Sequence, residues 1–172
     1  MGTIYYLAYG SNLHPLRITE RAASGKLLGV LQMPGYALAF HKRSTDKSGK
    51  CLFYQTKNLE NEIHCALFSL SETDKDELDN LEGLGHGYFE QSVTVTVDGN
   101  TYRSSIYAAQ PDFVDSSLQP YDWYKGLVLA GARYHRFPDA YVQKIDAIPS
   151  ISDPDANRAR KREDLLRRMN EV

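Results

Sequence analysis

Apolar runs alternate with short polar turns along the N-terminal part of the chain, a pattern typical of β-strands. The run Thr3–Tyr9 is rich in aromatic and aliphatic residues and stops at Gly10-Ser11-Asn12. This predicts a buried strand that ends in a tight loop. Four similar runs, separated by turn residues, predict strands at Leu28–Met33, Tyr36–Lys42, Cys51–Thr56 and Ile63–Ser69.

The clearest hairpin is expected in the middle of the chain. Tyr88–Val97 and Thr101–Ala109 are two strand-like runs, and residues 92–97 alternate between polar and apolar side chains with a period of two. Asp98-Gly99-Asn100 provides turn residues between them. We therefore expect these runs to form an antiparallel pair.

Helical patterns are fewer and come later. Ser71 is the expected N-cap of one helix, with Asp74 as a weak capping-box partner, and Gly83 and Gly85 are expected to close it. Further helices are predicted at about Tyr121–Tyr134, from Pro138, and after Asp153-Pro154. Since the strands come first and do not alternate with helices, the pattern predicts an α+β domain built on a mostly antiparallel sheet.

Composition narrows the class of protein. The chain has 172 residues, enough for one domain, and its 42% hydrophobic and 11% aromatic content is typical of a folded globular protein. A formal net charge of −2 argues against nucleic acid or an acidic membrane as the main partner. The sequence has neither a secretory signal pattern nor an apolar stretch near the roughly 18 residues of a membrane span. We therefore expect a cytoplasmic protein.

Metal and cofactor chemistry have little support in the sequence. The common nucleotide-binding, metalloprotease and serine-hydrolase signatures are missing. Cys51 and Cys65 both lie in predicted strands, which favours buried free thiols over a disulfide. The histidines show no metal-ligand spacing and are interpreted as surface or packing residues: His14, His41, His64, His86 and His135. The sequence therefore predicts chemistry that needs no metal and no bound cofactor.

The loop after the first strand is a candidate anion site. Gly10 lets the backbone turn between a bulky strand residue and two small polar ones, so that consecutive amide groups can face one point. Such a concavity suits a carboxylate or a developing oxyanion. The alternative is an ordinary turn in which Ser11 or Asn12 caps the next segment.

Glu82 is a candidate acid/base. On a helix it follows Leu78 by four residues and Leu81 by one, which places it at the border of the apolar face. The negative end of the helix and burial both disfavour the charged carboxylate there. A carboxyl group in such a place can both accept and return a proton. The alternative is a solvated glutamate at a helix end.

Three motifs follow one another in a characteristic order. Tyr9–Asn12 reads Tyr-Gly-Ser-Asn, and Leu78–Gly83 reads Leu-Asp-Asn-Leu-Glu-Gly with Gly87-Tyr88 shortly after it. Tyr121–Lys125 then leads into an apolar helix that ends in Gly131-Ala132. In this order and spacing, over roughly residues 3–150, the chain resembles the γ-glutamylcyclotransferase family, which includes γ-glutamylamine cyclotransferases and AIG2-like proteins.

The resemblance implies a fold, a reaction and a site. The fold is α+β, with a small, mostly antiparallel β-barrel-like sheet and a few flanking helices. In the reaction the α-amine of the substrate attacks its own γ-amide carbonyl, which releases an amine and forms 5-oxoproline. Glu82 is the implied catalytic acid/base. The implied substrate-binding residues are Tyr9, Gly10, Ser11, Asn12, Leu13, Tyr88 and Tyr124.

The sequence does not determine the leaving amine, since an amino acid, a peptide such as that of glutathione, and an alkyl amine all fit. A member of the fold that binds a carboxylate metabolite or a protein partner without turnover is the alternative function. The tyrosines have core packing as their alternative role, and His86 is expected to be an exposed loop residue. Either a monomer or a homodimer fits the sequence.

The C-terminal segment lies outside the resemblance. We expect residues 1–150 to form the cyclotransferase-like domain and residues 151–172 to form a basic helix packed on it or extending from it. The run Arg158–Arg162 predicts a solvated helix face, partly paired through Glu163 and Arg167. Docking of a partner is the alternative interpretation of these charges.

Overall fold

The computed structural model describes residues 2–172. Its strands form a five-stranded sheet in the order β2-β5-β1-β7-β6 and a two-stranded sheet of β3 and β4. Neighbouring strands are antiparallel except for β1 and β7, which are parallel, so the expected mostly antiparallel sheet is confirmed. The strands are β1 Thr3–Ala8, β2 Lys26–Pro34, β3 Tyr36–Arg43, β4 Gly49–Gln55, β5 Glu62–Ser71, β6 Tyr88–Val97 and β7 Asn100–Ala109.

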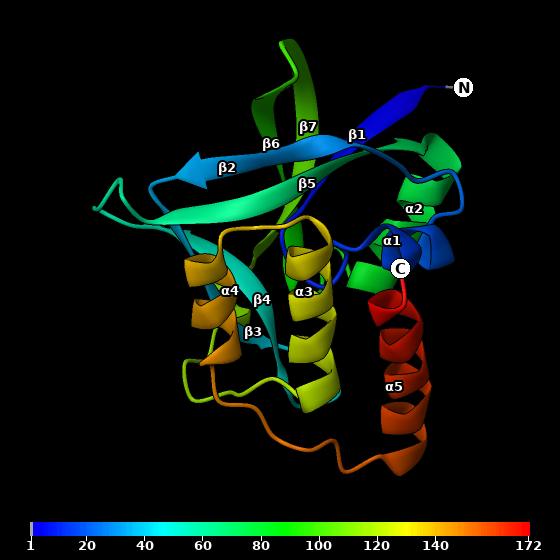
Figure 1. Ribbon diagram of the computed structural model, residues 1–172, viewed down its shortest axis with the longest axis vertical. Helices are drawn as coiled ribbons and strands as arrows, with labels where there is room; N and C mark the ends of the chain where they lie inside the picture. Colours follow the sequence, from blue (N-terminus) through cyan, green and yellow to red (C-terminus); the bar gives the residue numbers. More distant parts are fainter. Residues whose placement is uncertain (1) are drawn as a thin grey trace.

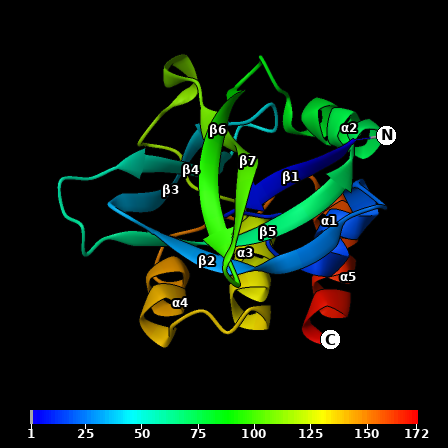
Figure 2. The same cartoon turned by 90° about the horizontal axis from the view of Figure 1, so that it is seen from above.

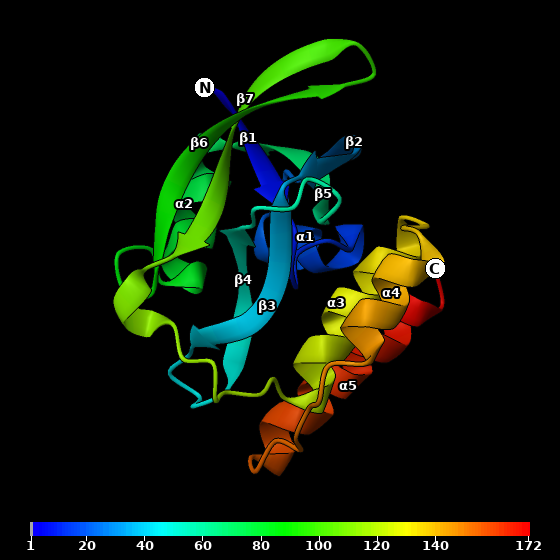
Figure 3. The ribbon, with the colours of Figure 1, turned by 90° about the vertical axis from the view of Figure 1, so that its left-hand side faces the viewer.

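The helices cover the strands from one side and from one edge. They are α1 Pro15–Arg21, α2 Glu72–Glu82, α3 Asp122–Tyr134, α4 Asp139–Asp146 and α5 Ala156–Asn170, with a 3-10 turn at Pro111–Phe113. Figures 1 and 3 show α3, α4 and α5 as a layer beside the strands, with the β6–β7 hairpin extending away from them. Among the helices of residues 2–172, none has the length and apolar character to cross a membrane.

The five-stranded sheet curls toward a barrel, as Figure 2 shows from above. Its two edge strands approach each other, since a Cβ on Gly29 of β2 would lie 2.4 Å from Cγ1 of Val97 of β6. Glycine at this position therefore allows the sheet edges to meet. The side chains of Leu7, Leu67 and Ile106 are fully buried inside the curl. The α+β fold with a barrel-like sheet is thus confirmed.

The structure contains the predicted caps of α2 and a tight turn in the β6–β7 hairpin. The Ser71 side chain accepts a hydrogen bond from the Asp74 amide, and Gly83 ends α2 in the left-handed conformation with φ of 71°. In the β6–β7 hairpin the turn is the dipeptide Asp98-Gly99, both with positive φ, which is type I′ geometry. Asn100 already pairs with Val97, so it belongs to the strand and not to the predicted three-residue turn.

Helix α1 has no counterpart among the predicted elements. It is short, at seven residues, and His14 is its N-cap, with Nδ1 accepting a hydrogen bond from the Leu16 amide. Pro15 occupies the first helical position, where its missing N–H costs nothing. The helix matters for function because it carries Arg17 and Arg21.

Candidate active site

The loop after β1 presents a row of backbone amides. Leu13 donates its amide hydrogen to the Gly10 carbonyl at 3.2 Å, which closes the turn. The amides of Gly10, Ser11 and Asn12 have no acceptor within residues 2–172. Gly10 is required here by close approach and not by a positive φ, because a Cβ would lie 2.9 Å from the Cβ of Cys51 on β4. Strand β4 thus presses against the loop and limits its first residue to glycine.

Glu82 is the last residue of α2, and its carboxylate meets this loop. Asn12 donates from Nδ2 to Glu82 Oε1 at 2.9 Å and also to the Tyr6 hydroxyl at 3.1 Å. The Glu82 side chain is 15% exposed. The two motifs, seventy residues apart in sequence, are therefore joined by a direct hydrogen bond.

Arg21 is a candidate site residue that the sequence did not reveal. Its Nη1 donates to the same Glu82 oxygen, as an ion pair, and to Asn12 Oδ1 at 2.9 Å. This cation is a partner that the expectation drawn from the helix end and burial did not include, because it comes from α1, an element that was not predicted.

The three predicted pocket tyrosines are all buried beside the loop. Tyr88 donates its hydroxyl hydrogen to the Cys51 carbonyl at 2.6 Å, and the Tyr124 hydroxyl accepts from the Cys51 amide at 3.0 Å. Tyr9 donates to the Tyr107 carbonyl at 2.6 Å. Burial raises the pKa of Tyr9, Tyr88 and Tyr124, so their hydroxyls stay protonated at neutral pH. The Tyr88 and Tyr124 hydroxyls hold β4 in place, the Tyr9 hydroxyl bonds to β7, and the three rings form walls.

These groups enclose a small space, here called the inner pocket. It includes residues that sequence reasoning did not single out, namely Tyr6, Cys51 and Tyr107. The Tyr107 hydroxyl donates to Asp79 Oδ1 at 2.6 Å and so ties β7 to α2, one turn before Glu82. The full lining is Tyr6, Tyr9, Gly10, Ser11, Asn12, Cys51, Glu82, Tyr88, Tyr107 and Tyr124.

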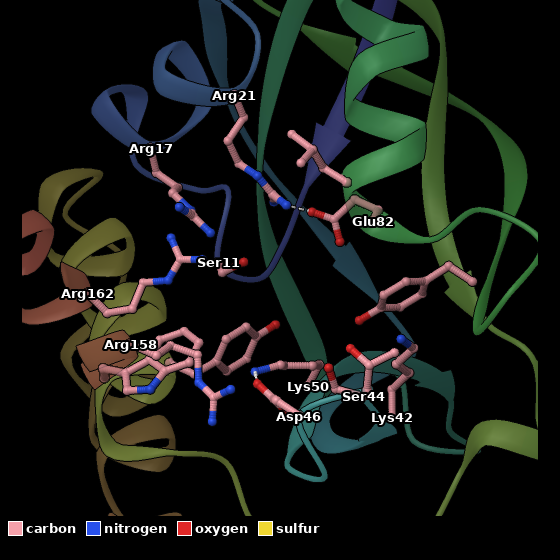
Figure 4. Close-up of a pocket in the computed structure, with 15 residues that line it drawn as sticks. Ser11, Arg17, Arg21, Lys42, Ser44, Asp46, Lys50, Glu82, Arg158 and Arg162 are labelled. Atoms are coloured by element: carbon pink, nitrogen blue, oxygen red, sulfur yellow. Dashed lines mark hydrogen bonds and ion pairs between the residues drawn. The ribbon is translucent and has the colours of Figure 1, made fainter. Parts of the chain in front are cut away.

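A larger space, the outer cavity, adjoins the inner pocket and shares with it Ser11, Glu82, Tyr88 and Tyr124. Its volume is about 290 Å³. Figure 4 shows that α1, α5 and the β3–β4 hairpin all send charged side chains into it. Its basic residues are Arg17, Arg21, Lys42, Lys50, Arg158 and Arg162.

The basic run on α5 differs from its expectation. Arg158 and Arg162 line the outer cavity instead of forming a solvated face. The predicted pairing of Arg167 with Glu163 is also wrong, since Arg167 lies 3.9 Å from Asp164 and 3.8 Å from Glu171. Because α5 packs on α3 and α1, one side of the helix faces the cavity and only the other faces solvent.

Two further residues can now be placed. Leu13 was implied as a substrate-binding residue, but its side chain is fully buried against Gly131 of α3 and does not line either space. Its carbonyl accepts a hydrogen bond from His135 Nε2 at 2.6 Å, so Leu13 anchors the loop to the helix layer. His86 is exposed in the turn after α2. Within residues 2–172 no cluster of three or more His, Cys, Asp or Glu side chains could hold a metal ion.

Known proteins resemble this chain in part of its sequence and in its fold. Residues 62–145, which include Glu82, Tyr88 and Tyr124, match the AIG2-like family. The whole fold is similar to that of a solved γ-glutamyl cyclotransferase, with a TM-score of 0.82 and 24% identity over 97% of this chain and 99% of that one. Residues 62–145 are thus similar to the AIG2-like family, and the chain as a whole has the γ-glutamylcyclotransferase-like fold.

Other solved structures have the same fold as this chain. An uncharacterised protein from Homo sapiens has a TM-score of 0.79 and 23% identity, covering 97% of this chain and 99% of that one. A yeast γ-glutamyl cyclotransferase specific to glutathione has a TM-score of 0.53 and 13% identity, covering 99% and 97%. Among curated proteins, none matches the chain by sequence. At these identities the solved structures establish the fold alone.

Proposed function

We propose that the chain is an intramolecular cyclotransferase, which converts a γ-glutamyl amine or γ-glutamyl peptide to 5-oxoproline and a free amine. The observation that carries the proposal is the hydrogen bond from Asn12 to Glu82. It places a carboxylate that can move protons beside a row of unpartnered amides, inside a pocket with aromatic walls. The AIG2-like match and the fold support the same reaction.

The proposed reaction needs a nucleophile, which the substrate itself provides. The α-amine nitrogen forms a bond with the γ-carbonyl carbon, and the bond from that carbon to the leaving nitrogen breaks. Folding the glutamyl chain so that these atoms meet is a proximity effect worth several kcal/mol. The buried tyrosine rings around the loop provide rigid walls against which a short chain can fold.

Glu82 moves the protons in this scheme. The attacking nitrogen starts as an ammonium and ends as a ring amide, so it loses two protons, and the leaving nitrogen gains two. Glu82 accepts each proton from the α-nitrogen and returns it to the leaving nitrogen. The ion pair with Arg21 holds the carboxylate beside Asn12 before the first transfer. Acid/base catalysis of this kind contributes about 10²–10⁴-fold to a rate.

The loop amides stabilise the negative charge that develops on the carbonyl oxygen of the substrate. As the α-nitrogen adds, the carbonyl oxygen becomes an oxyanion, and the amides of Gly10, Ser11 and Asn12 can donate to it or to the α-carboxylate. A preorganised donor at such a position contributes about 3 kcal/mol. Close packing of Gly10 against Cys51 keeps these donors fixed before the substrate arrives.

One observation favours the alternative, binding of a carboxylate metabolite without turnover. Glu82 is engaged by both Arg21 and Asn12, so substrate ammonium must compete with an existing ion pair. A protein that only binds would use these contacts to shape the pocket. Turnover therefore separates the two functions, whereas binding of a γ-glutamyl compound does not.

The test is release of 5-oxoproline from γ-glutamyl amino acids, γ-glutamyl alkyl amines and glutathione. We expect the wild type to turn over at least one compound, and Glu82→Gln to lower its rate by about 10²-fold or more. Glu77→Gln changes an exposed glutamate on the same helix and is expected to leave the rate unchanged. Binding without turnover by the wild type, or full activity of Glu82→Gln, would contradict the proposal.

A further inference from the structure

Positive charge dominates the outer cavity. Six basic side chains line it, against two carboxylates, those of Asp46 and Glu82. This contrasts with the whole chain, whose formal net charge is −2. The excess is therefore local, and it adjoins the inner pocket, so that a leaving amine extending out of the inner pocket would enter the outer cavity.

Three of the six basic residues have carboxylate partners. Arg21 pairs with Glu82, Lys50 pairs with Asp46 at 2.8 Å, and Arg158 pairs with Asp153 at 2.5 Å. Arg17, Lys42 and Arg162 form no ion pair with any described residue of the chain (2–172). The excess thus resides in these three side chains.

Arg17 is the most informative of them. It is 6% exposed, and its Nε is buried without a hydrogen-bond partner among residues 2–172. Burying a charge without a partner is costly, and a folded protein retains such a group where a ligand provides the missing contact. Arg17 lines the outer cavity, so a ligand there can reach it.

The Arg17 and Arg162 guanidinium groups point toward each other near Ser11, as Figure 4 shows. Burial and the neighbouring Arg21 and Arg162 lower the pKa of Arg17 to about 10. Burial and Arg21 lower that of Arg162 as well. Both groups are still cations at neutral pH, so two like charges face one another across a space lined by a hydroxyl. An oxyanion between them would relieve this repulsion and accept bidentate hydrogen bonds.

Lys42 provides the third charge on another side of the cavity. It is 7% exposed, and its Nζ lies 4.4 Å from the centre of the Tyr88 ring. A Cβ on Gly87 would lie 2.7 Å from this Nζ, so the glycine leaves room for the ammonium group. Lys42 is therefore placed to meet a second anionic group, apart from the one between the arginines.

We infer that this cavity selects γ-glutamyl substrates whose leaving amine carries two negative charges, with one oxyanion bound between Arg17 and Arg162. The inference rests on the proposed cyclotransferase function. The γ-glutamyl part carries one ammonium and one carboxylate, so its own charges cancel and leave the three cations uncompensated. Two carboxylates, or one phosphate, on the leaving amine would compensate about two of these three charges.

Binding is measured first, with probes that cannot cyclise. N-glutarylglutamate and N-glutarylglutamine lack the α-amine and differ only in one terminal carboxylate or amide. By calorimetry we expect the wild type to bind the glutamate compound about tenfold more tightly, as for one charge-assisted contact. This preference is expected to weaken as salt is added.

Turnover is measured on the matching substrates. γ-Glutamylglutamate is compared with γ-glutamylglutamine, and γ-glutamyl-O-phosphoserine with γ-glutamylserine, so that the two pairs distinguish a carboxylate from a phosphate. Arg162→Gln is expected to lower kcat/KM about tenfold for the more anionic member of the preferred pair and less than about twofold for the less anionic member. Arg167→Gln, an exposed change of the same charge on the same helix, is expected to change neither.

The outcomes separate the two proposals. Equal binding of the two glutaryl probes, or a preference that persists in Arg162→Gln, overturns the anion site even where 5-oxoproline is released. Selective binding of N-glutarylglutamate without any turnover upholds the anion site and overturns the cyclotransferase. Because Arg17 is buried and its substitution could unfold the protein, the decision rests on Arg162, which is half-buried on α5.

Discussion

Asn12 joins the Tyr9–Asn12 loop to Glu82 through a side-chain hydrogen bond, so the two motifs form one site. Its amide nitrogen donates to Glu82 and to the Tyr6 hydroxyl, and its oxygen accepts from Arg21. With 4% exposure, it has few alternative partners. A side chain with donors and an acceptor fixed in one plane can meet all three groups at once, which a serine or aspartate cannot.

Gly10 allows a prediction about the loop. Gly10→Ala places a Cβ 2.9 Å from the Cβ of Cys51, too close for two carbon atoms, so the loop must move away from β4. We expect kcat to fall about tenfold or more, because the amide donors leave their positions. Ala23→Gly, an exposed change beyond α1, is the control in the steady-state kinetic assay. Unchanged kcat in Gly10→Ala would show that the loop amides take no part in the reaction.

At the scale of elements, α5 completes the outer cavity and Asp153 fixes its start. The Asp153 carboxylate accepts from Trp123 Nε1 of α3 at 2.8 Å and from two nitrogens of Arg158 of α5. These hydrogen bonds lower the pKa of Asp153, with the contact to Arg158 as the main cause. The start of the helix that brings Arg158 and Arg162 to the cavity is therefore attached to α3 through one carboxylate.

Asp153→Asn tests this attachment. We expect the free energy of unfolding to fall by about 2 kcal/mol at neutral pH, the usual worth of hydrogen bonds to a charged group. Since the pKa is lowered in the folded state, this contribution is present above about pH 4 and is lost as the pH falls below it. Urea unfolding at neutral pH and below about pH 4 measures this contribution to the free energy of unfolding. Asp164→Asn, an exposed change on α5, is the control. Equal stability of Asp153→Asn and the wild type at neutral pH would contradict the role of Asp153.

Some of the helices and strands could be predicted from the sequence and others could not. The strands and α2 were predictable because period-two alternation, the Ser71 cap and Gly83 are local signals. Helix α1 was not, because seven residues have no clear amphipathic period and the only signal is Pro15 after a polar residue. Arg17 and Arg21 were missed with it. The cavity-facing side of α5 was missed because a charge run on an isolated helix contains no information on what packs beside it.

At the scale of the whole molecule, burial of the two cysteine thiols makes the stability of the fold depend on pH. Cys51 and Cys65 are free and buried, as predicted. Burial raises the pKa of Cys51 to about 12 and also raises that of Cys65. In the unfolded chain a thiol ionises near about pH 8.5. Above that pH the folded protein keeps protons that the unfolded chain releases, so stability falls as the pH rises.

We expect the free energy of unfolding to decrease by about 2 kcal/mol between about pH 8 and about pH 9.5, if each thiol contributes about 1 kcal/mol. Urea unfolding measures this decrease. A Cys51→Ala, Cys65→Ala double variant is less stable at every pH but is expected to lack most of the decline. The same slope in the double variant would assign the decline to other groups.

The arrangement of charge also belongs to the whole molecule. A chain with a net charge of −2 brings six basic residues from α1, α5 and the β3–β4 hairpin to one cavity. Net charge excluded nucleic acid as an expected partner but gave no hint of this local excess, because the residues are scattered between positions 17 and 162. The Glu82 and Tyr9–Asn12 motifs were predictable because each is contiguous in sequence.

The proposed function requires that Glu82 catalyses attack by the substrate's own α-amine. The most direct measurement follows a heavy nitrogen isotope placed on that amine of a γ-glutamyl substrate, with mass spectrometry of the products. We predict that the wild type transfers the label into 5-oxoproline, with unlabelled amine in equal amount, and that Glu82→Gln forms neither product at a comparable rate. Labelled glutamate in place of labelled 5-oxoproline would mean that water is the nucleophile, and would contradict the account.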